Sequence, residues 1–132
     1  MAYPRVAVAV IAFLLVAAVP AGYSAEAATA DQFEVRTTAD YVALCTTPPE
    51  DDTYQAATAF CYGFAVGAYQ YYAALAEQSA SYRYVCLPTP PPTRSSALTD
   101  FVAWLKTHQQ YLPEKPVDTI FRYLQARYPC GQ

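Results

Sequence analysis

The sequence predicts an all-α fold, a compact bundle of about four helices with a long central helix, stapled by two disulfides. Three observations support this prediction. Eleven prolines divide the chain into segments whose apolar residues recur with helical spacing. The longest of these segments, Thr53–Ala76, contains neither a proline nor a charged residue. The four cysteines are an even number, and all of them lie beyond residue 40.

The composition limits the functions that the chain can have. Its 132 residues fit one domain. Hydrophobic residues make up 55% and charged residues 14%, well below the roughly 25% of an average soluble domain, so charge-driven disorder is excluded for most of the chain. A net charge of −3 provides no basic surface for phosphates, which argues against nucleic acid as a partner. The single histidine excludes a His-rich metal site, and we expect no metal and no cofactor.

Residues 1–30 are typical of a secretory signal peptide. A basic residue precedes the unbroken apolar run Val6–Val19, which is shorter than the about 20 residues that span a bilayer. Two Ala-x-Ala cleavage sites follow, ending at Ala27 and at Ala30, and the sequence does not choose between them. The alternative is an uncleaved N-terminal anchor. We therefore expect one periplasmic domain over residues 31–132, with no membrane association after cleavage.

The first helix is predicted over about Ala39–Thr46. Residues Thr37–Asp40 have the Ser/Thr-x-x-Asp/Glu pattern of a helix start, and Pro48 ends the helix because proline lacks an amide donor. We interpret the acidic run Glu50–Asp52 as negative charge placed at the positive, N-terminal end of the next helix dipole, where it stabilises the helix. The alternative, a calcium site, is disfavoured because the alternating acids and central glycine of a calcium loop are missing.

A long helix of about 26 residues is predicted around Thr53–Ala76. Apolar side chains lie on nearly all of its sides, so we expect it to be the central, buried helix. Gly63 and Gly67 would let another helix approach it closely. The alternative is a transmembrane span with a Gly-x-x-x-Gly motif, which the interrupting Thr and Gln residues and the scattered tyrosines disfavour.

A proline-rich connector over Ser81–Thr93 follows, and its composition favours an extended path. It is either a recognition loop or a rigid linker, and the sequence favours neither. Tyrosine and arginine are enriched at binding hot spots. The candidate partner-binding residues are therefore four side chains in and beside this connector, namely Tyr82, Arg83, Tyr84 and Arg94.

The next helix, capped by Ser95 or Ser96, is predicted to run to about Gln109 with one apolar face. His108 lies at the edge of that face. A catalytic histidine needs a nucleophile and an orienting acid, and the sequence offers no such set. We interpret His108 as a half-exposed structural residue and expect no catalytic residues.

The last helix is predicted to begin with Pro116 at its first position and to end before Pro129. Asp118 and Arg122, four residues apart, are expected to pair on its outer face. Its inner face is an apolar stripe, formed by Val117, Ile120, Phe121, Leu124 and Tyr128.

An exported chain favours disulfide formation, and four cysteines allow three pairings. Cys45 ends a short helix and Cys61 lies in the helix that follows a tight turn, so an antiparallel arrangement would bring the two together. Cys86 and Cys130 both lie in irregular chain just beyond helix ends. We expect these two pairs, with Cys61–Cys130 as the alternative.

Four motifs occur together in one order along the chain. They are the block Cys61–Gly67, the loop Cys86-Leu87-Pro88, a helix ending Trp104–His108, and the terminal Tyr128-Pro129-Cys130. With the export signal and four cysteines, this pattern resembles the Rap/Tai family of periplasmic immunity proteins. The resemblance covers about Ala39 to Cys130, nearly the whole expected domain.

The resemblance implies a small all-α protein, a homodimer, that binds a peptidoglycan amidase effector protein delivered by type VI secretion and occludes its active site. Such an immunity protein has no catalytic residues of its own. The alternative is a small helical periplasmic acid-stress chaperone, whose dimer would dissociate as carboxylates are protonated. An enzyme using Cys–His chemistry is disfavoured, because an even set of cysteines in an oxidising compartment leaves no free thiol.

Overall fold

The computed structural model describes residues 27–131, so nearly all of the predicted signal peptide lies outside the described residues. The described chain forms helices and no β-strand, which confirms the predicted all-α fold. Its elements in chain order are the 3₁₀ helix η1 (Ala30–Glu34), α1 (Thr38–Cys45), α2 (Tyr54–Gln78), η2 (Ala80–Tyr82), α3 (Arg94–Leu105), η3 (Gln109–Tyr111) and α4 (Pro116–Arg127).

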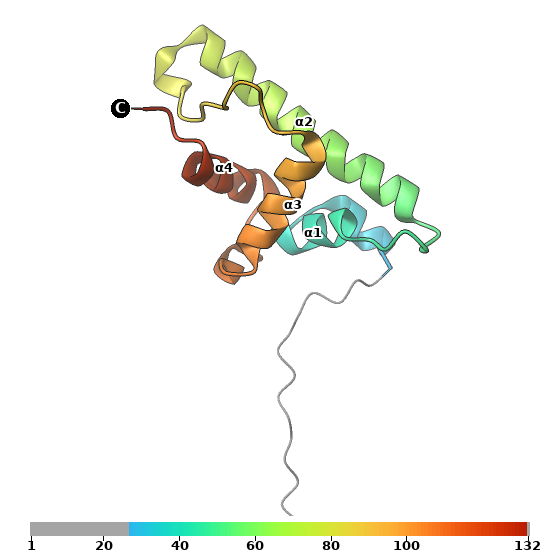
Figure 1. Ribbon diagram of the computed structural model, residues 1–132. Helices are drawn as coiled ribbons and strands as arrows, with labels where there is room; N and C mark the ends of the chain where they lie inside the picture. The colour runs from blue at the N-terminus through green and yellow to red at the C-terminus, as the bar shows by residue number, and fades with distance from the viewer. Residues whose placement is uncertain (1–26, 132) are drawn as a thin grey trace, which may run out of the picture.

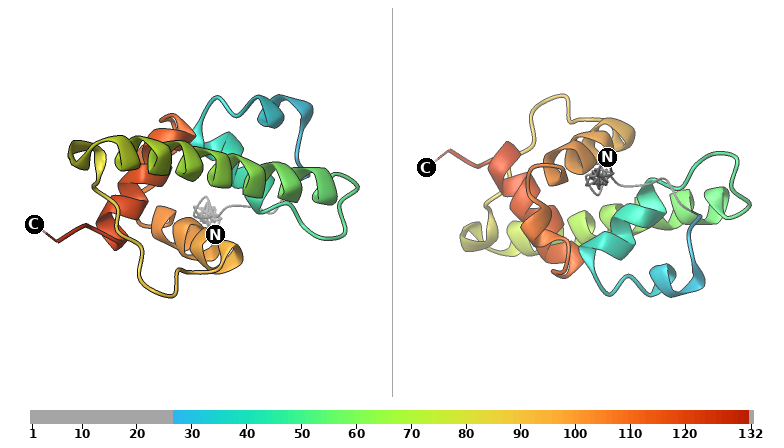
Figure 2. Two further views of the ribbon diagram at one scale, coloured as in Figure 1. Left: turned by 90° about the horizontal axis from the view of Figure 1, so that it is seen from above. Right: turned by 90° about the horizontal axis from the view of Figure 1, so that it is seen from below.

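Helix α2 runs along the whole domain, and the three other helices gather along one side of it (Figure 1). The connector between α2 and α3 loops around the edge of the domain, as the views from above and below show (Figure 2). One core lies where the helices meet and includes side chains from all four, among them Tyr41, Cys61, Phe101 and Ile120. Burial of these apolar side chains is the main favourable term that holds the helices together.

Helix α1 begins with the predicted capping box. The Thr37 side chain accepts the Asp40 N–H, and the Asp40 carboxylate accepts the Thr37 N–H at 2.9 Å. Thr38, the first residue of α1, is fully buried. Its hydroxyl oxygen lies 2.8 Å from the Thr119 hydroxyl and 3.0 Å from the Glu114 carbonyl oxygen, and its single proton can be donated to either. This buried polar contact ties the start of α1 to α4.

Helix α2 has the predicted length, but the expectation that it is buried on nearly all sides is wrong. Its fully buried residues lie on one face, and the opposite face is exposed along Phe60, Gly63 and Gly67. A Cβ atom added at either glycine would meet nothing within 4 Å, so no helix within residues 27–131 approaches them closely. The reason is topological, because α1, α3 and α4 all lie on the same side of α2 (Figure 1).

Both expected disulfides form. Cys45 pairs with Cys61 across α1 and α2, with a Cα–Cα distance of 5.2 Å. Cys86 pairs with Cys130, with a Cα–Cα distance of 4.8 Å, and joins the connector to the C-terminal end of the chain. The alternative Cys61–Cys130 pairing is therefore excluded.

Two details of the last helices differ from prediction. Helix α3 is capped by Thr93, whose hydroxyl accepts the Ser96 N–H at 3.1 Å, and it ends at Leu105 rather than near Gln109. Thr93 can act as the cap because its backbone is extended just before the first helical turn.

Arg122 pairs with Glu114, Nε to Oε2 at 3.0 Å, and not with the predicted Asp118. The turn before α4 brings Glu114 beside the helix, where its carboxylate faces the guanidinium group. Pro116 does occupy the first turn of α4, as predicted.

The acidic run before α2 acts through a local turn. The Asp51 carboxylate accepts the Thr53 N–H at 2.7 Å and the Thr53 hydroxyl at 2.5 Å. These hydrogen bonds lower the pKa of Asp51, because they stabilise the charged form.

Candidate protein-binding surface

The hydroxyl group of Tyr72 holds the first part of the connector against α2. It accepts the N–H groups of Tyr84 at 3.0 Å and Val85 at 2.8 Å, and it donates to the Val85 carbonyl at 3.2 Å. Tyr72 is buried, so these bonds satisfy a polar group that would otherwise be costly to remove from water. The path of the connector after residue 83 is thus set by one side chain of α2.

The C-terminal end of the chain holds the same segment from the other side. Val85 forms an antiparallel bridge with Pro129, and the Cys86 N–H donates to the Tyr128 carbonyl at 2.9 Å. The Cys86–Cys130 disulfide closes this contact covalently. Residues 84–86 are therefore fixed on both sides, which favours a preorganised surface over a mobile loop.

Three of the four predicted partner-binding residues lie together just beyond the end of α2. Tyr82 is 51% exposed and Tyr84 is 38% exposed. Arg83, between them, is exposed and donates from Nη2 to the Ala76 carbonyl at 3.5 Å. Its positive charge there interacts favourably with the negative, C-terminal end of the α2 dipole. Two exposed tyrosines beside an arginine are typical of a protein-binding hot spot.

Tyr84 also lines a groove of about 470 Å³ between α2 and α4, which we call the Tyr84 groove. Its ring packs against Tyr72, with ring centroids 4.8 Å apart. Burial and, to a smaller extent, the neighbouring Tyr72 raise the pKa of Tyr84 above that of a free tyrosine. Tyr71 on α2 and Val117 on α4, 70% and 42% exposed, line the same groove.

Sequence reasoning missed Tyr71 and Val117. The adjacent pair Tyr71 and Tyr72 held a usable signal, because neighbouring residues on a helix point about 100° apart. A helix packed on one side only cannot bury both side chains. Val117 carried no comparable signal. Helical spacing places it on the apolar inner face of α4, whereas in the structure it is 42% exposed.

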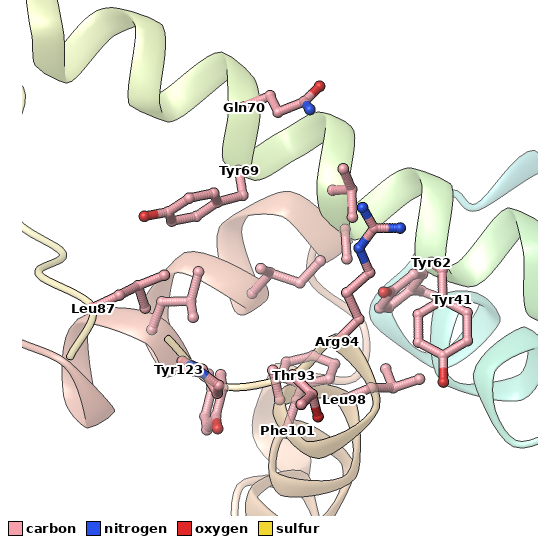
Figure 3. A pocket seen from close by; sticks show the side chains of 16 residues that line it. Tyr41, Tyr62, Tyr69, Gln70, Leu87, Thr93, Arg94, Leu98, Phe101 and Tyr123 are labelled. Atoms are coloured by element: carbon pink, nitrogen blue, oxygen red, sulfur yellow. The ribbon is translucent and has the colours of Figure 1, made fainter. Parts of the chain in front are cut away.

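Arg94 is not part of this surface. It is the first residue of α3, and it lines a second cavity of about 310 Å³, which is open to the surface. Helices α2, α3 and α4 form most of its wall, with contributions from Tyr41 of α1 and from the connector. Its side chain extends from the start of α3 toward α2 (Figure 3). The sequence grouped Arg94 with Tyr82–Tyr84 because they share one connector, but the connector carries them to different cavities.

The remaining reactive side chains have structural contacts. The His108 ring stacks on Trp104 with ring centroids 4.0 Å apart, and its Nδ1 lies 2.8 Å from the Trp104 carbonyl oxygen. All four cysteines are in disulfides. Within residues 27–131 no three His, Cys, Asp or Glu residues are placed to hold a metal ion.

A comparison with protein-family models decides the family. The model of the Rap1a immunity proteins matches residues 37–130. The chain belongs to the Rap1a immunity protein family. The match begins at Thr37, the cap of α1, and ends at Cys130, so it includes both disulfides and the Tyr82–Tyr84 segment.

The comparisons with curated proteins and with solved structures found no match. Among the described residues of this Rap1a family member, no helix is long and apolar enough to cross a membrane. Its two disulfides and its family agree with a periplasmic or secreted location.

Proposed function

We propose that this protein is a periplasmic, non-enzymatic immunity protein that binds a peptidoglycan amidase toxin delivered by type VI secretion and occludes its active site. The observation that carries the proposal is the Rap1a family match over residues 37–130. The predicted signal peptide in residues 1–30 would deliver the protein to the compartment where such a toxin acts.

The Tyr82–Tyr84 segment and the adjoining Tyr84 groove are the proposed toxin-binding surface. Of the large hydrophobic side chains that the described chain exposes, Tyr71, Tyr84 and Val117 share this groove. Exposed apolar residues gathered at one place mark interaction sites more often than residues scattered singly. The hydrogen bonds that the N–H groups of Tyr84 and Val85 donate to the Tyr72 hydroxyl reduce the ordering cost of binding, because the segment is already held in one conformation.

The experiment is a pull-down with the tagged, disulfide-intact protein from extracts of the native organism, read by mass spectrometry. We expect a stoichiometric peptidoglycan amidase whose activity is lost in the complex. Unrelated periplasmic proteins bound only at low pH would instead support the acid-stress chaperone, and an enzymatic activity of the protein alone would contradict the proposal.

Variants then test the surface. Tyr82→Ala combined with Tyr84→Ala should weaken toxin binding at least about thirtyfold, since a hot-spot residue contributes about 2 kcal/mol or more. The matched control is Tyr54→Ala, which removes a tyrosine at the opposite end of α2. Equal affinities for the double variant and the control would place the toxin-binding surface elsewhere.

We also propose that the protein is a homodimer that pairs through the exposed face of α2. Support comes from the uncharged stretch between Thr53 and Ala76 and from the open space at Gly63 and Gly67, where a second helix could approach closely. Gly67→Glu would place a charge on that face without a clash inside the chain. Light scattering should then report a monomer, and a persistent dimer would exclude this interface.

A further inference from the structure

The cavity beside Arg94 has the size and lining of a small-molecule site. Its volume of about 310 Å³ lies at the lower end of the range found for ligand pockets, roughly 300–1,000 Å³. Its apolar lining includes the buried Phe101 from α3 and Ile120 and Leu124 from α4. Polar side chains line it as well, among them Tyr62, Tyr69 and Gln70. A mostly apolar pocket with a few polar groups is typical of a small-molecule site.

Two alanines leave this space open. Ala65 of α2 and Ala97 of α3 line the cavity from different helices, and both are half-buried. Their small side chains leave the wall without the bulk that would close it. A larger apolar residue at either position would reduce the open space.

Arg94 is the one charged side chain that lines this cavity. Arg94 lines the cavity and is also exposed to solvent, so it lies at the opening of the cavity. Figure 3 shows its side chain extending from α3 toward α2. The ion pairs within residues 27–131 are Arg36–Glu34 and Arg122–Glu114, so no carboxylate of the described chain is paired with Arg94. Its planar guanidinium group can bind a carboxylate with two parallel hydrogen bonds.

We propose that this cavity binds a small amphiphilic monocarboxylate, with its alkyl or aromatic body among the apolar side chains and its carboxylate on Arg94. One cation at the opening of an apolar cavity matches one anionic group at the end of an apolar body. This function is separate from toxin binding, and it uses a different cavity.

The test is titration calorimetry of the full protein with decanoate and, separately, with decanol, both below the concentration at which they form micelles. The unmodified protein should bind decanoate with one-to-one stoichiometry and bind decanol more weakly. Arg94→Gln should weaken decanoate binding about tenfold and leave decanol binding unchanged, because only the charge-assisted hydrogen bonds are lost. Arg94 is exposed, so this variant leaves the core intact.

Ala97→Phe should abolish binding of both probes by filling the cavity. Its matched control is Ala103→Phe, which adds the same ring to the same helix at an exposed position that does not line the cavity. If Ala97→Phe does not fold, the affinities of Arg94→Gln for decanoate and for decanol still test whether Arg94 binds the carboxylate.

Failure of both probes to bind the unmodified protein would overturn the proposal. So would unchanged decanoate affinity in Arg94→Gln. If the unmodified protein binds neither probe and Ala97→Phe loses toxin binding, the cavity would instead accept a side chain of the toxin. Toxin binding that survives in Ala97→Phe, together with lost decanoate binding, would show two separate sites.

Discussion

The hydroxyl group of Tyr72 and the backbone of Val85 form two hydrogen bonds, one in each direction, at 2.8 and 3.2 Å. This relationship joins the C-terminal third of α2, the longest helix, to the connector. It places Tyr84 against α2 and so sets one wall of the proposed toxin-binding groove. A single buried oxygen atom therefore couples the fold to the candidate site.

Tyr72→Phe should destabilise the protein by about 1–3 kcal/mol, because the N–H groups of Tyr84 and Val85 lose their acceptor. The measurement is the free energy of unfolding from denaturant titration. Tyr71→Phe is the matched control, since Tyr71 is 70% exposed, and its change should stay within about 0.5 kcal/mol. Equal changes in the two variants would show that the Tyr72 hydroxyl does not hold the connector.

Replacing Cys86 and Cys130 together by alanine should cost about 4 kcal/mol of stability. The two cysteines are 44 residues apart, and a cross-link across a loop of that length restricts the unfolded chain by roughly this amount. Denaturant unfolding of the variant and of the unmodified protein measures the difference. Unchanged stability would mean that the contacts of Val85 and Cys86 with the C-terminal end suffice without the bond.

The buried hydroxyls of Thr38 and Thr119 should show coupling in a double-mutant cycle. Thr38→Val alone should cost about 1–3 kcal/mol, because the buried Thr119 hydroxyl loses its partner at 2.8 Å and keeps only the Tyr111 carbonyl at 3.4 Å. The Glu114 carbonyl still accepts the Thr38 N–H at 2.7 Å. Thr38→Val with Thr119→Val should cost less than the sum of the single changes. Additive losses in urea unfolding would show that the two hydroxyls act independently.

Stability should fall above about pH 10, the pKa of a tyrosine in the unfolded chain. Burial raises the pKa of Tyr41 and of Tyr123 in the folded protein. Above pH 10 the unfolded tyrosines lose their protons while the folded ones keep them, so each group lowers the free energy of unfolding by about 1.4 kcal/mol per pH unit. This contribution is fully present below pH 10.

The measurement is the free energy of unfolding from pH 8 to about pH 11.5, a range chosen around the unfolded pKa. Tyr41→Phe should have a shallower decline than the unmodified protein. The variant also loses the hydrogen bond from Tyr41 to the Cys61 carbonyl at 3.0 Å, so the slopes and not the absolute values are compared. Identical slopes would contradict the assignment.

The sequence by itself predicted the helices and favoured the two disulfides, with Cys61–Cys130 left as an alternative. The capping box at Thr37 and Pro116 at the start of α4 are local signals, because a helix end needs partners within three or four residues. Both disulfides were also within reach of the sequence. Cys45 and Cys61 lie in consecutive helices, and Cys86 and Cys130 lie in irregular chain just beyond helix ends.

Only the tertiary structure decided which residues meet across the domain. Composition could not show that α2 is covered on one side only, and that arrangement exposes Gly67 and Tyr71. Nor could the spacing of charges show that Arg122 pairs with Glu114, or that Arg94 lies at a different cavity from Tyr84. Helical periodicity specifies which residues share a face, whereas the partner of each face depends on how all four helices pack at once.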